Sequence, residues 1–453
     1  MRIRFGMVLL VFLGLPAAFV GVTAAFYALA ALGERALLKW FGVPGGGGAV
    51  NSVTLMVLML MVFAGLLTLA ERKWSGAMQD RIGPNRANIG SFRWGGLPHF
   101  LADALKMIFK EDFTPERASK FLFSVAPALV FVPAMLLFAV VPVAPPIYTS
   151  LHGLLAEPVT VALQVAAPDF GVLFVFAFAS LAVYGTTIAG WASNNKLALL
   201  GAVRASSQMI GYEVALGLSL VGMMLTFSTV RLDAMSALQG TWLWGGTGAF
   251  DVGLPAWGIF LQPIGFLLFF AAAFAETKRA PFDMPEGESE IVGYFVEYSG
   301  LKFGLFMISE FVEVVVLSGV ITAIFLGGYH LPFGERWLQM HIGPNWLATL
   351  QGATFWVKVL IMCWLQLTVR WTFPRFRYDQ VQKLCWKMLL PLGLANIFVS
   401  GALVLLDRGD LRLLALAGIL EIVVMVAVIA VKPKPAAVPQ VAEAAAHGHA
   451  AGH

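Results

Sequence analysis

The chain has 453 residues, of which 59% are hydrophobic and only 12% are charged. About a quarter of the residues of a soluble domain are charged, so this composition excludes a soluble protein and indicates a polytopic membrane protein. The net charge of +4 is small and the basic residues gather in loops, which indicates membrane topology and no nucleic-acid partner. The two cysteines, Cys363 and Cys385, predict neither a disulfide framework nor a metal site.

Long apolar runs predict an all-α fold, a polytopic membrane protein with about ten transmembrane helices. The predicted helices cover about residues 5–32, 51–70, 121–142, 170–190, 205–227, 258–275, 298–327, 350–369, 388–406 and 411–431. The loop 71–120 is rich in Lys and Arg and is therefore expected in the cytoplasm, which places both termini there. Because Arg2 and Arg4 precede the first run, a cleaved signal peptide is the alternative to a first spanning helix.

Residues 97–110 within this loop predict a short amphipathic helix on the cytoplasmic side. The apolar side chains at positions 97, 101, 104, 105 and 108 share one helical face, and the segment is too short to span a bilayer. It is either a helix lying on the membrane surface or a lid over a cavity that opens sideways to lipid, and the two interpretations are compatible.

Acidic residues concentrate between residues 274 and 313, where a loop joins two apolar runs. Pro281 and Pro285 flank Asp283 and disfavour a helix, so we expect an ordered loop at the membrane surface. Four further carboxylates lie in or at the mouths of apolar runs: Glu213, Glu297, Glu310 and Glu313. A charge inside a spanning helix is costly unless it faces water, a partner or a proton, so these four residues predict a buried proton path.

Five segments carry a resemblance to a known family. They read LAERKWSGAMQDRIGPNR, LADALKMIFKE, SSQMIGYEVALGLSL, FAETKRAPFDMPEGESEIVGYFVEYSG and YDQVQKLCWKMLLPL. In this order along the chain they resemble the H-subunit family of respiratory complex I, which includes mitochondrial NADH dehydrogenase subunit 1. The resemblance covers about residues 51–406, the expected membrane core. It leaves out residues 1–50, expected as an extra helix and a Gly-rich linker, 407–431, an extra helix, and 432–453, a disordered tail.

The resemblance implies a membrane subunit of a proton-translocating NADH:quinone oxidoreductase in the bacterial plasma (inner) membrane. Members of the family hold no redox cofactor themselves, so quinone is the expected substrate, and flavin and iron-sulfur clusters are expected on partner subunits. The expected partners are quinone, the peripheral-arm subunits that carry the terminal iron-sulfur cluster, the other membrane-arm subunits and the lipid bilayer.

The candidate site residues fall into three groups, with no catalytic residue and no metal ligand among them. The quinone chamber is expected to include Glu71, Arg72, Gln79, Arg81, Arg279, Asp283, Glu286 and Glu288. The proton path is expected to include Glu213, Glu297, Glu310 and Glu313. The quinone entrance helix is expected to present Phe100, Asp103, Ala104 and Lys106.

Simpler interpretations stay open for several of these residues. Taken alone, Glu71 and Arg72 are an interfacial ion pair that ends a helix, and Glu286 and Glu288 are a solvated acidic face. Ferredoxin-linked and deazaflavin-linked complexes and membrane-bound hydrogenases contain a relative of this protein, so the electron donor is open. A stand-alone ion-coupled transporter is the alternative from another class, and it predicts internal repeats. The pattern of residues 274–313 has no second copy in the chain.

Overall fold

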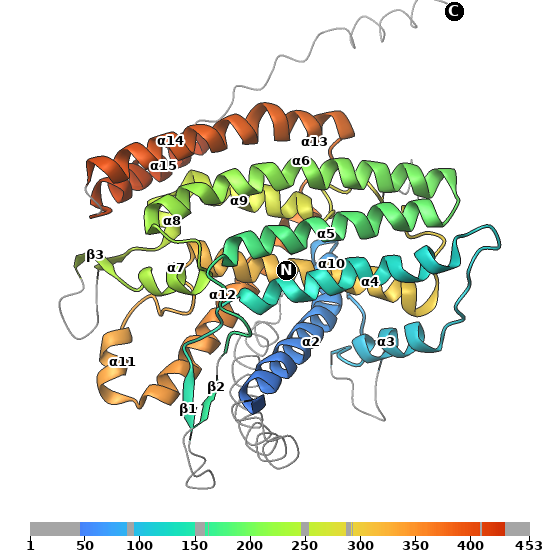
Figure 1. Ribbon diagram of the computed structural model, residues 1–453, viewed down its shortest axis with the longest axis horizontal. Coiled ribbons are helices and arrows are strands. Elements are labelled where there is room, and N and C mark those ends of the chain that lie inside the picture. Colours follow the sequence, from blue (N-terminus) through green and yellow to red (C-terminus); the bar gives the residue numbers. More distant parts are fainter. Residues whose placement is uncertain are drawn as a thin grey trace, which may run out of the picture.

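The computed structural model describes residues 46–87, 95–149, 159–161, 163–245, 253–286, 291, 293–407 and 410–430 (Figure 1). Its helices are α2 (Gly46–Met78), α3 (His99–Phe109), α4 (Lys120–Leu137), η1 (Phe138–Val140), α5 (Gly171–Ala192), α6 (Lys196–Phe227), α7 (Leu232–Leu238), α8 (Gly258–Leu261), α9 (Pro263–Glu276), α10 (Gly300–Phe325), α11 (Glu335–His341), α12 (Pro344–Thr372), α13 (Tyr378–Leu384), η3 (Cys385–Leu389), α14 (Leu390–Leu406) and α15 (Arg412–Ala430). Two small antiparallel hairpins pair β1 (Ile147–Thr149) with β2 (Val159–Val161) and β3 (Trp242–Gly245) with β4 (Gly253–Pro255). The predicted all-α membrane fold is confirmed.

Seven helical segments in these ranges are long and apolar enough to cross a membrane. They are Lys120–Val140, Gly171–Ala192, Lys196–Phe227, Gly300–Phe325, Pro344–Thr372, Tyr378–Leu406 and Arg412–Ala430. The predicted span 51–70 lies within α2, a helix of 33 residues. The first predicted span, residues 5–32, and the tail 432–453 lie outside the described residues.

Helix α10 lies inside the bundle and is the most enclosed of these spans (Figure 1). All its residues from Ser309 to Phe325 are buried, and it packs against α2, α3, α4, α7, α9 and α12. Its sequence is apolar on every side, which is the pattern of a helix surrounded by other helices. Glu310 and Glu313 therefore sit on the best-shielded helix of the fold.

Helices occupy much of the two segments that separate predicted spans, residues 191–204 and 370–387. Helix α6 already begins at Lys196, because the Asn195 side chain caps it by accepting a hydrogen bond from Leu197 N at 3.0 Å. Helix α13 begins at Tyr378 and continues through η3 into α14. A helix can continue beyond the hydrocarbon core, so a charged residue in the sequence does not by itself mark a helix end.

The predicted span 258–275 is also wrong as a single helix. Helix α8 ends at Leu261, Gln262 adopts φ −143° and ψ 71°, and α9 starts at Pro263. At the break, Gln262 Nε2 donates a hydrogen bond to Thr226 Oγ1 at 2.8 Å. Because α9 has only 14 residues, roughly 21 Å of helix, its last residue, Glu276, ends inside the bundle.

Helices α14 and α15 lie at the edge of the bundle (Figure 1), and most of their side chains are exposed. Helix α15 docks through a narrow face made of Leu414, Ala415 and Gly418. A Cβ atom at Gly418 would lie 2.0 Å from the Phe260 carbonyl oxygen, so this close approach to α8 requires glycine.

Candidate functional site

Glu71 on α2 binds two arginines from distant parts of the chain. Its Oε2 accepts a hydrogen bond from Arg279 Nη1 at 2.8 Å, and its Oε1 lies 2.6 Å from Arg370 Nη1 at the end of α12. The Arg279 guanidinium also covers the ring of Phe311 at 4.0 Å. The side chains of Glu71 and Arg279 are only 10% and 5% exposed, so this is a buried ion cluster with one positive charge in excess.

The segment after α9 is the ordered loop that its prolines predict, as far as residue 286. The C-terminal end of α12 leads into a stretch of chain that holds this loop in place. Phe376 N donates to the Pro281 carbonyl at 3.1 Å. Arg375 donates to the Asp283 carbonyl and lies 3.8 Å from the Asp283 carboxylate. The contact fixes Asp283 and Glu286 against the bundle, because Asp283 Oδ1 accepts a hydrogen bond from Glu286 N at 3.0 Å.

Glu286 links this loop to α10. Its carboxyl group shares a side-chain hydrogen bond with the carboxyl group of Glu310. Two carboxylates are both acceptors, so such a bond exists only when one of the two carries a proton. Burial, followed by the nearby carboxylates of Glu310 and Asp283, raises the pKa of Glu286 well above its ordinary value. The pair is therefore suited to hold one proton between the loop and α10.

Three carboxylates from three helices line one small cavity deeper in the bundle: Glu213 of α6, Glu276 of α9 and Glu313 of α10. The remaining lining is apolar and comes mainly from α4 and α5. Lys278, whose side chain is fully buried, places its Nζ 3.9 Å from Glu313 Oε2. Glu313 lies one helical turn after Glu310, so the cavity adjoins the proton-holding pair.

Several buried polar atoms in this part of the bundle have no hydrogen-bond partner among the described residues. They are Gln208 Oε1, Glu276 Oε2, Lys278 Nζ, Arg279 Nε, Tyr294 OH and Glu313 Oε2. Leaving a buried polar group unpaired costs about 1–3 kcal/mol, and buried water usually bonds to such groups. A water molecule bonded to Glu276 Oε2 or to Glu313 Oε2 would satisfy an unpaired carboxylate oxygen at the cavity.

Helix α3 lies across the ends of α2 and α10, and it presents its apolar residues outward. Phe100 packs on Gly65 of α2, and Asp103 forms an ion pair with Arg72 at 2.8 Å. Ala104 and Lys106 are exposed, as are the apolar side chains at positions 97, 101, 105 and 108. The apolar face thus remains free to contact lipid.

The structure places the predicted site residues Gln79, Arg81 and Glu297 apart from this cluster. Gln79 and Arg81 are exposed and contact each other, with Arg81 Nε donating to Gln79 Oε1 at 2.6 Å. Glu297 accepts a hydrogen bond from Asn195 Nδ2 at 2.6 Å, near the start of α6 and apart from Glu310. Glu288 lies outside the described residues.

Four residues of the cluster were absent from the predicted groups: Glu276, Lys278, Tyr294 and Arg370. Glu276 ends an apolar run and Lys278 follows it, so a search for charges at run ends would have found both. Burial, followed by the carboxylates of Glu310 and Glu286, raises the pKa of Tyr294, which keeps its hydroxyl protonated. The ring of Tyr294 lies 6.0 Å from Lys278 Nζ. No sequence signal marks Tyr294 or Arg370, because tertiary packing alone brings them to the site.

Fold and site together define an integral membrane protein with a helical bundle. Neighbouring carboxyl groups lie inside the bundle, and arginine and lysine side chains partly neutralise their negative charge. The chain is 40% identical over 351 residues to the NADH-quinone oxidoreductase H subunit of Flavobacterium psychrophilum, a match that covers 77% of this chain and 95% of the relative. It is 41% identical over 356 residues to an H subunit of Geobacter metallireducens (78% and 95% covered). It is 40% identical over 370 residues to that of Bdellovibrio bacteriovorus (78% and 95% covered).

The NADH dehydrogenase family matches residues 50–401 of this chain. The chain therefore belongs to the NADH dehydrogenase family. The relatives' shared name favours neither a stand-alone transporter nor a hydrogenase.

Proposed function

We propose that this chain is the H subunit, a membrane component, of a proton-translocating NADH:quinone oxidoreductase in the bacterial plasma membrane, with both termini in the cytoplasm. Quinone is the substrate and the chain binds no redox cofactor. Flavin and iron-sulfur clusters belong to partner subunits, and the peripheral-arm subunit with the terminal cluster docks near the loop of Asp283 and Glu286. Other membrane-arm subunits pack against the bundle. Family membership and the seven apolar helices support this assignment.

The observation that carries the proposal is the hydrogen bond between Glu286 and Glu310. It connects the two predicted groups of residues, since Glu286 belongs to the chamber and Glu310 to the proton path. Reduction of a quinone to a quinol takes up two electrons and two protons. The electrons come from the partner's cluster, and Glu286 is in place to supply a proton because burial and nearby carboxylates raise its pKa well above the ordinary value.

The excess positive charge of the Glu71 cluster has a second role in this proposal. Arg279 and Arg370 bear two positive charges against the single charge of Glu71. An anionic reduced quinone bound beside them would be stabilised before protonation. After Glu286 gives up its proton, Glu310 returns one to it, and Glu313, Glu276 and Glu213 replenish Glu310 through water in the cavity.

Helix α3 forms the quinone entrance in this proposal, because its exposed apolar face meets lipid while Phe100 and Asp103 bind it to α2. Residues 407–431 add one helix after the core, whereas the predicted first span, 5–32, and the tail, 432–453, lie outside the described residues. Helix α15 is that addition, and it begins after the part of the chain that matches the family.

Replacing Glu286 with Gln tests the function. The variant keeps the size and hydrogen-bonding capacity but cannot release a proton, so quinone reduction and proton translocation are expected to fall together in assembled complex. Electron transfer from NADH to an artificial acceptor is expected to stay normal. Wild-type activity is expected to decline as the pH rises through the raised pKa of Glu286, and the residual activity of the variant to lack that decline.

Glu297→Gln is the matched control, because Glu297 contacts Asn195 and not the cluster. Wild-type turnover and pumping in an assembled Glu286→Gln complex would exclude Glu286 from the proton path. Migration of the native chain as a small homo-oligomer in mild detergent, instead of as part of a large assembly, would favour a transporter.

A further inference from the structure

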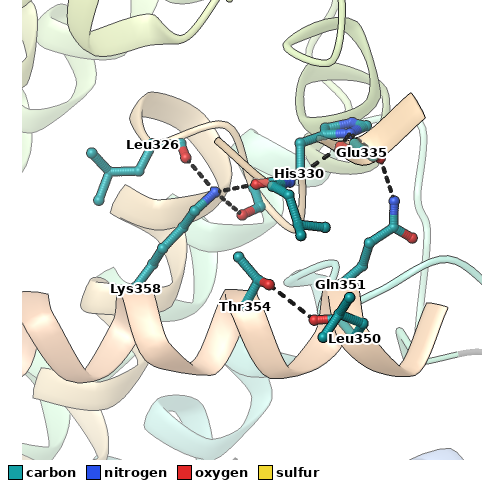
Figure 2. Close-up of polar contacts among 9 residues, drawn as sticks. Leu326, His330, Glu335, Leu350, Gln351, Thr354 and Lys358 are labelled. Carbon is teal, nitrogen blue, oxygen red and sulfur yellow. Dashed lines mark hydrogen bonds and ion pairs between the residues drawn. The ribbon is translucent and has the colours of Figure 1, made fainter. Parts of the chain in front are cut away.

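A second polar site lies where the turn after α10 meets α12 (Figure 2). Lys358 of α12 donates hydrogen bonds to three backbone carbonyls, those of Leu326 at 2.8 Å, Gly328 at 3.0 Å and His330 at 2.7 Å. Its Nζ also lies 4.3 Å from the centre of the Trp257 ring. A neutral amine has only two N–H groups, so three carbonyl oxygens within 3.0 Å match the three N–H groups of an ammonium ion.

The turn that supplies these carbonyls is held in shape by contacts other than Lys358. Gly327 and Gly328 adopt φ of 75° and 51°, and Gly327 N donates to Gln239 Oε1 at 2.9 Å. A Cβ atom on Gly327 would lie 2.2 Å from Trp257 Nε1, so the turn packs directly on the indole. The carbonyl oxygens and the aromatic ring are therefore positioned before a cation binds them.

The electrostatics of this turn favour a cation. The C-terminal end of a helix carries partial negative charge, which applies to Leu326, the C-cap of α10, and the face of an indole ring attracts cations. Glu335 adds a carboxylate to the same turn, since His330 Nδ1 lies 3.1 Å from Glu335 Oε1 and Leu331 N donates to Oε2 at 3.1 Å. Burial opposes ionisation of Glu335, but these bonds and one from Gln351 outweigh it and lower its pKa.

We infer that the carbonyls of Leu326, Gly328 and His330 and the ring of Trp257 form a binding cage for a monovalent N–H cation, filled by the chain's own Lys358. The bound ammonium fixes the end of α10 to α12. Helix α10 carries Glu310 and Glu313, so Lys358 is a positioning residue for them. This inference goes beyond the proposed function. The cage around Lys358 would exist whether or not Glu286, Glu310 and the cavity carboxylates transfer protons.

The test is Lys358→Met in the intact complex, with methylammonium chloride added to the emptied cage. Loss of the ammonium leaves three carbonyls unpaired, so quinone reductase activity and the half-life of the complex at elevated temperature are expected to fall roughly tenfold. Methylammonium is expected to restore both in a saturable manner, whereas tetramethylammonium, which has no N–H group, is expected to restore neither. Wild-type complex in the same salts corrects for effects on the proton gradient.

Lys302→Met is the matched control at the other end of α10. Lys302 pairs with the exposed carboxylate of Asp112 at 2.9 Å instead of with carbonyls, so methylammonium should not rescue that variant. If Lys358→Met fails to assemble, assembled complex in cells grown with and without methylammonium becomes the readout. Equal effects of the two amines, rescue of neither property, or an unimpaired Lys358→Met complex would each overturn the inference.

Discussion

The two arginines that share Glu71 are expected to affect stability in a strongly non-additive way. Each makes a charge-assisted hydrogen bond or ion pair in a buried setting, at 2.8 Å for Arg279 and 2.6 Å for Arg370. Such a bond contributes about 1.5–3 kcal/mol. When Arg279 or Arg370 alone is replaced by Ala, Glu71 keeps one cation. When both are replaced, Glu71 is left as an unpaired buried charge, which costs about 3–5 kcal/mol.

The assay is the half-life of the detergent-purified complex at a fixed elevated temperature, because large assemblies unfold irreversibly. Each single Arg→Ala variant is expected to shorten the half-life about tenfold to hundredfold. The second substitution is expected to cost more than the first, in either order. Arg72→Ala is the matched control, because Arg72 is 45% exposed and its pair with Asp103 contributes at most about 1 kcal/mol. Additive single effects, or equal damage from Arg72→Ala, would refute this account of the cluster.

Two further predictions concern the entrance and the cavity. Ala104→Trp on the exposed face of α3 should change the apparent KM for long-tailed quinones more than for short-tailed ones, because only a long tail crosses that face; equal changes would leave α3 as a plain surface helix. Glu276→Gln should lower quinone reduction and pumping together in assembled complex, with Glu276→Asp retaining more of each, because Glu276 lines the cavity with Glu213 and Glu313; normal pumping in Glu276→Gln would exclude the cavity as a proton route.

Local signals in the sequence were sufficient for the fold class. Apolar runs predicted the spanning helices, the amphipathic period predicted α3, and Pro281 and Pro285 predicted an ordered loop. The predicted helix boundaries were less accurate where a polar residue stabilises the start of a helix. Asn195 caps α6, so the helix begins at Lys196. The break at Gln262 was missed, because its stabilising partner, Thr226, belongs to another helix.

The candidate site shows the same limit. Glu310 and Glu313 were identifiable because a carboxylate in an apolar run has few structural explanations. Their counter-charges could not be assigned from the sequence, because the same helix offers only one cation, Lys302. That lysine pairs with Asp112, and the cations near Glu313 and Glu71 come from the loop after α9 and the end of α12. Glu71 and Arg279 are 208 positions apart, a separation at which one sequence gives no pairing information.

The proposed proton path and quinone chamber would be coupled through the charge of one carboxyl pair. With one proton, Glu286 and Glu310 are joined by a hydrogen bond, and the loop is fixed to α10. Loss of that proton to quinone leaves two adjacent anions in a poorly solvated place, where they repel each other strongly. Arg279 and Lys278 are the buried cations able to offset this repulsion, and both lie in the loop that carries Glu286. Chemistry in the chamber would thus change the forces on α10 directly. Reprotonation from the cavity of Glu313 and Glu276 would restore the bond, so a complete turnover requires both sites.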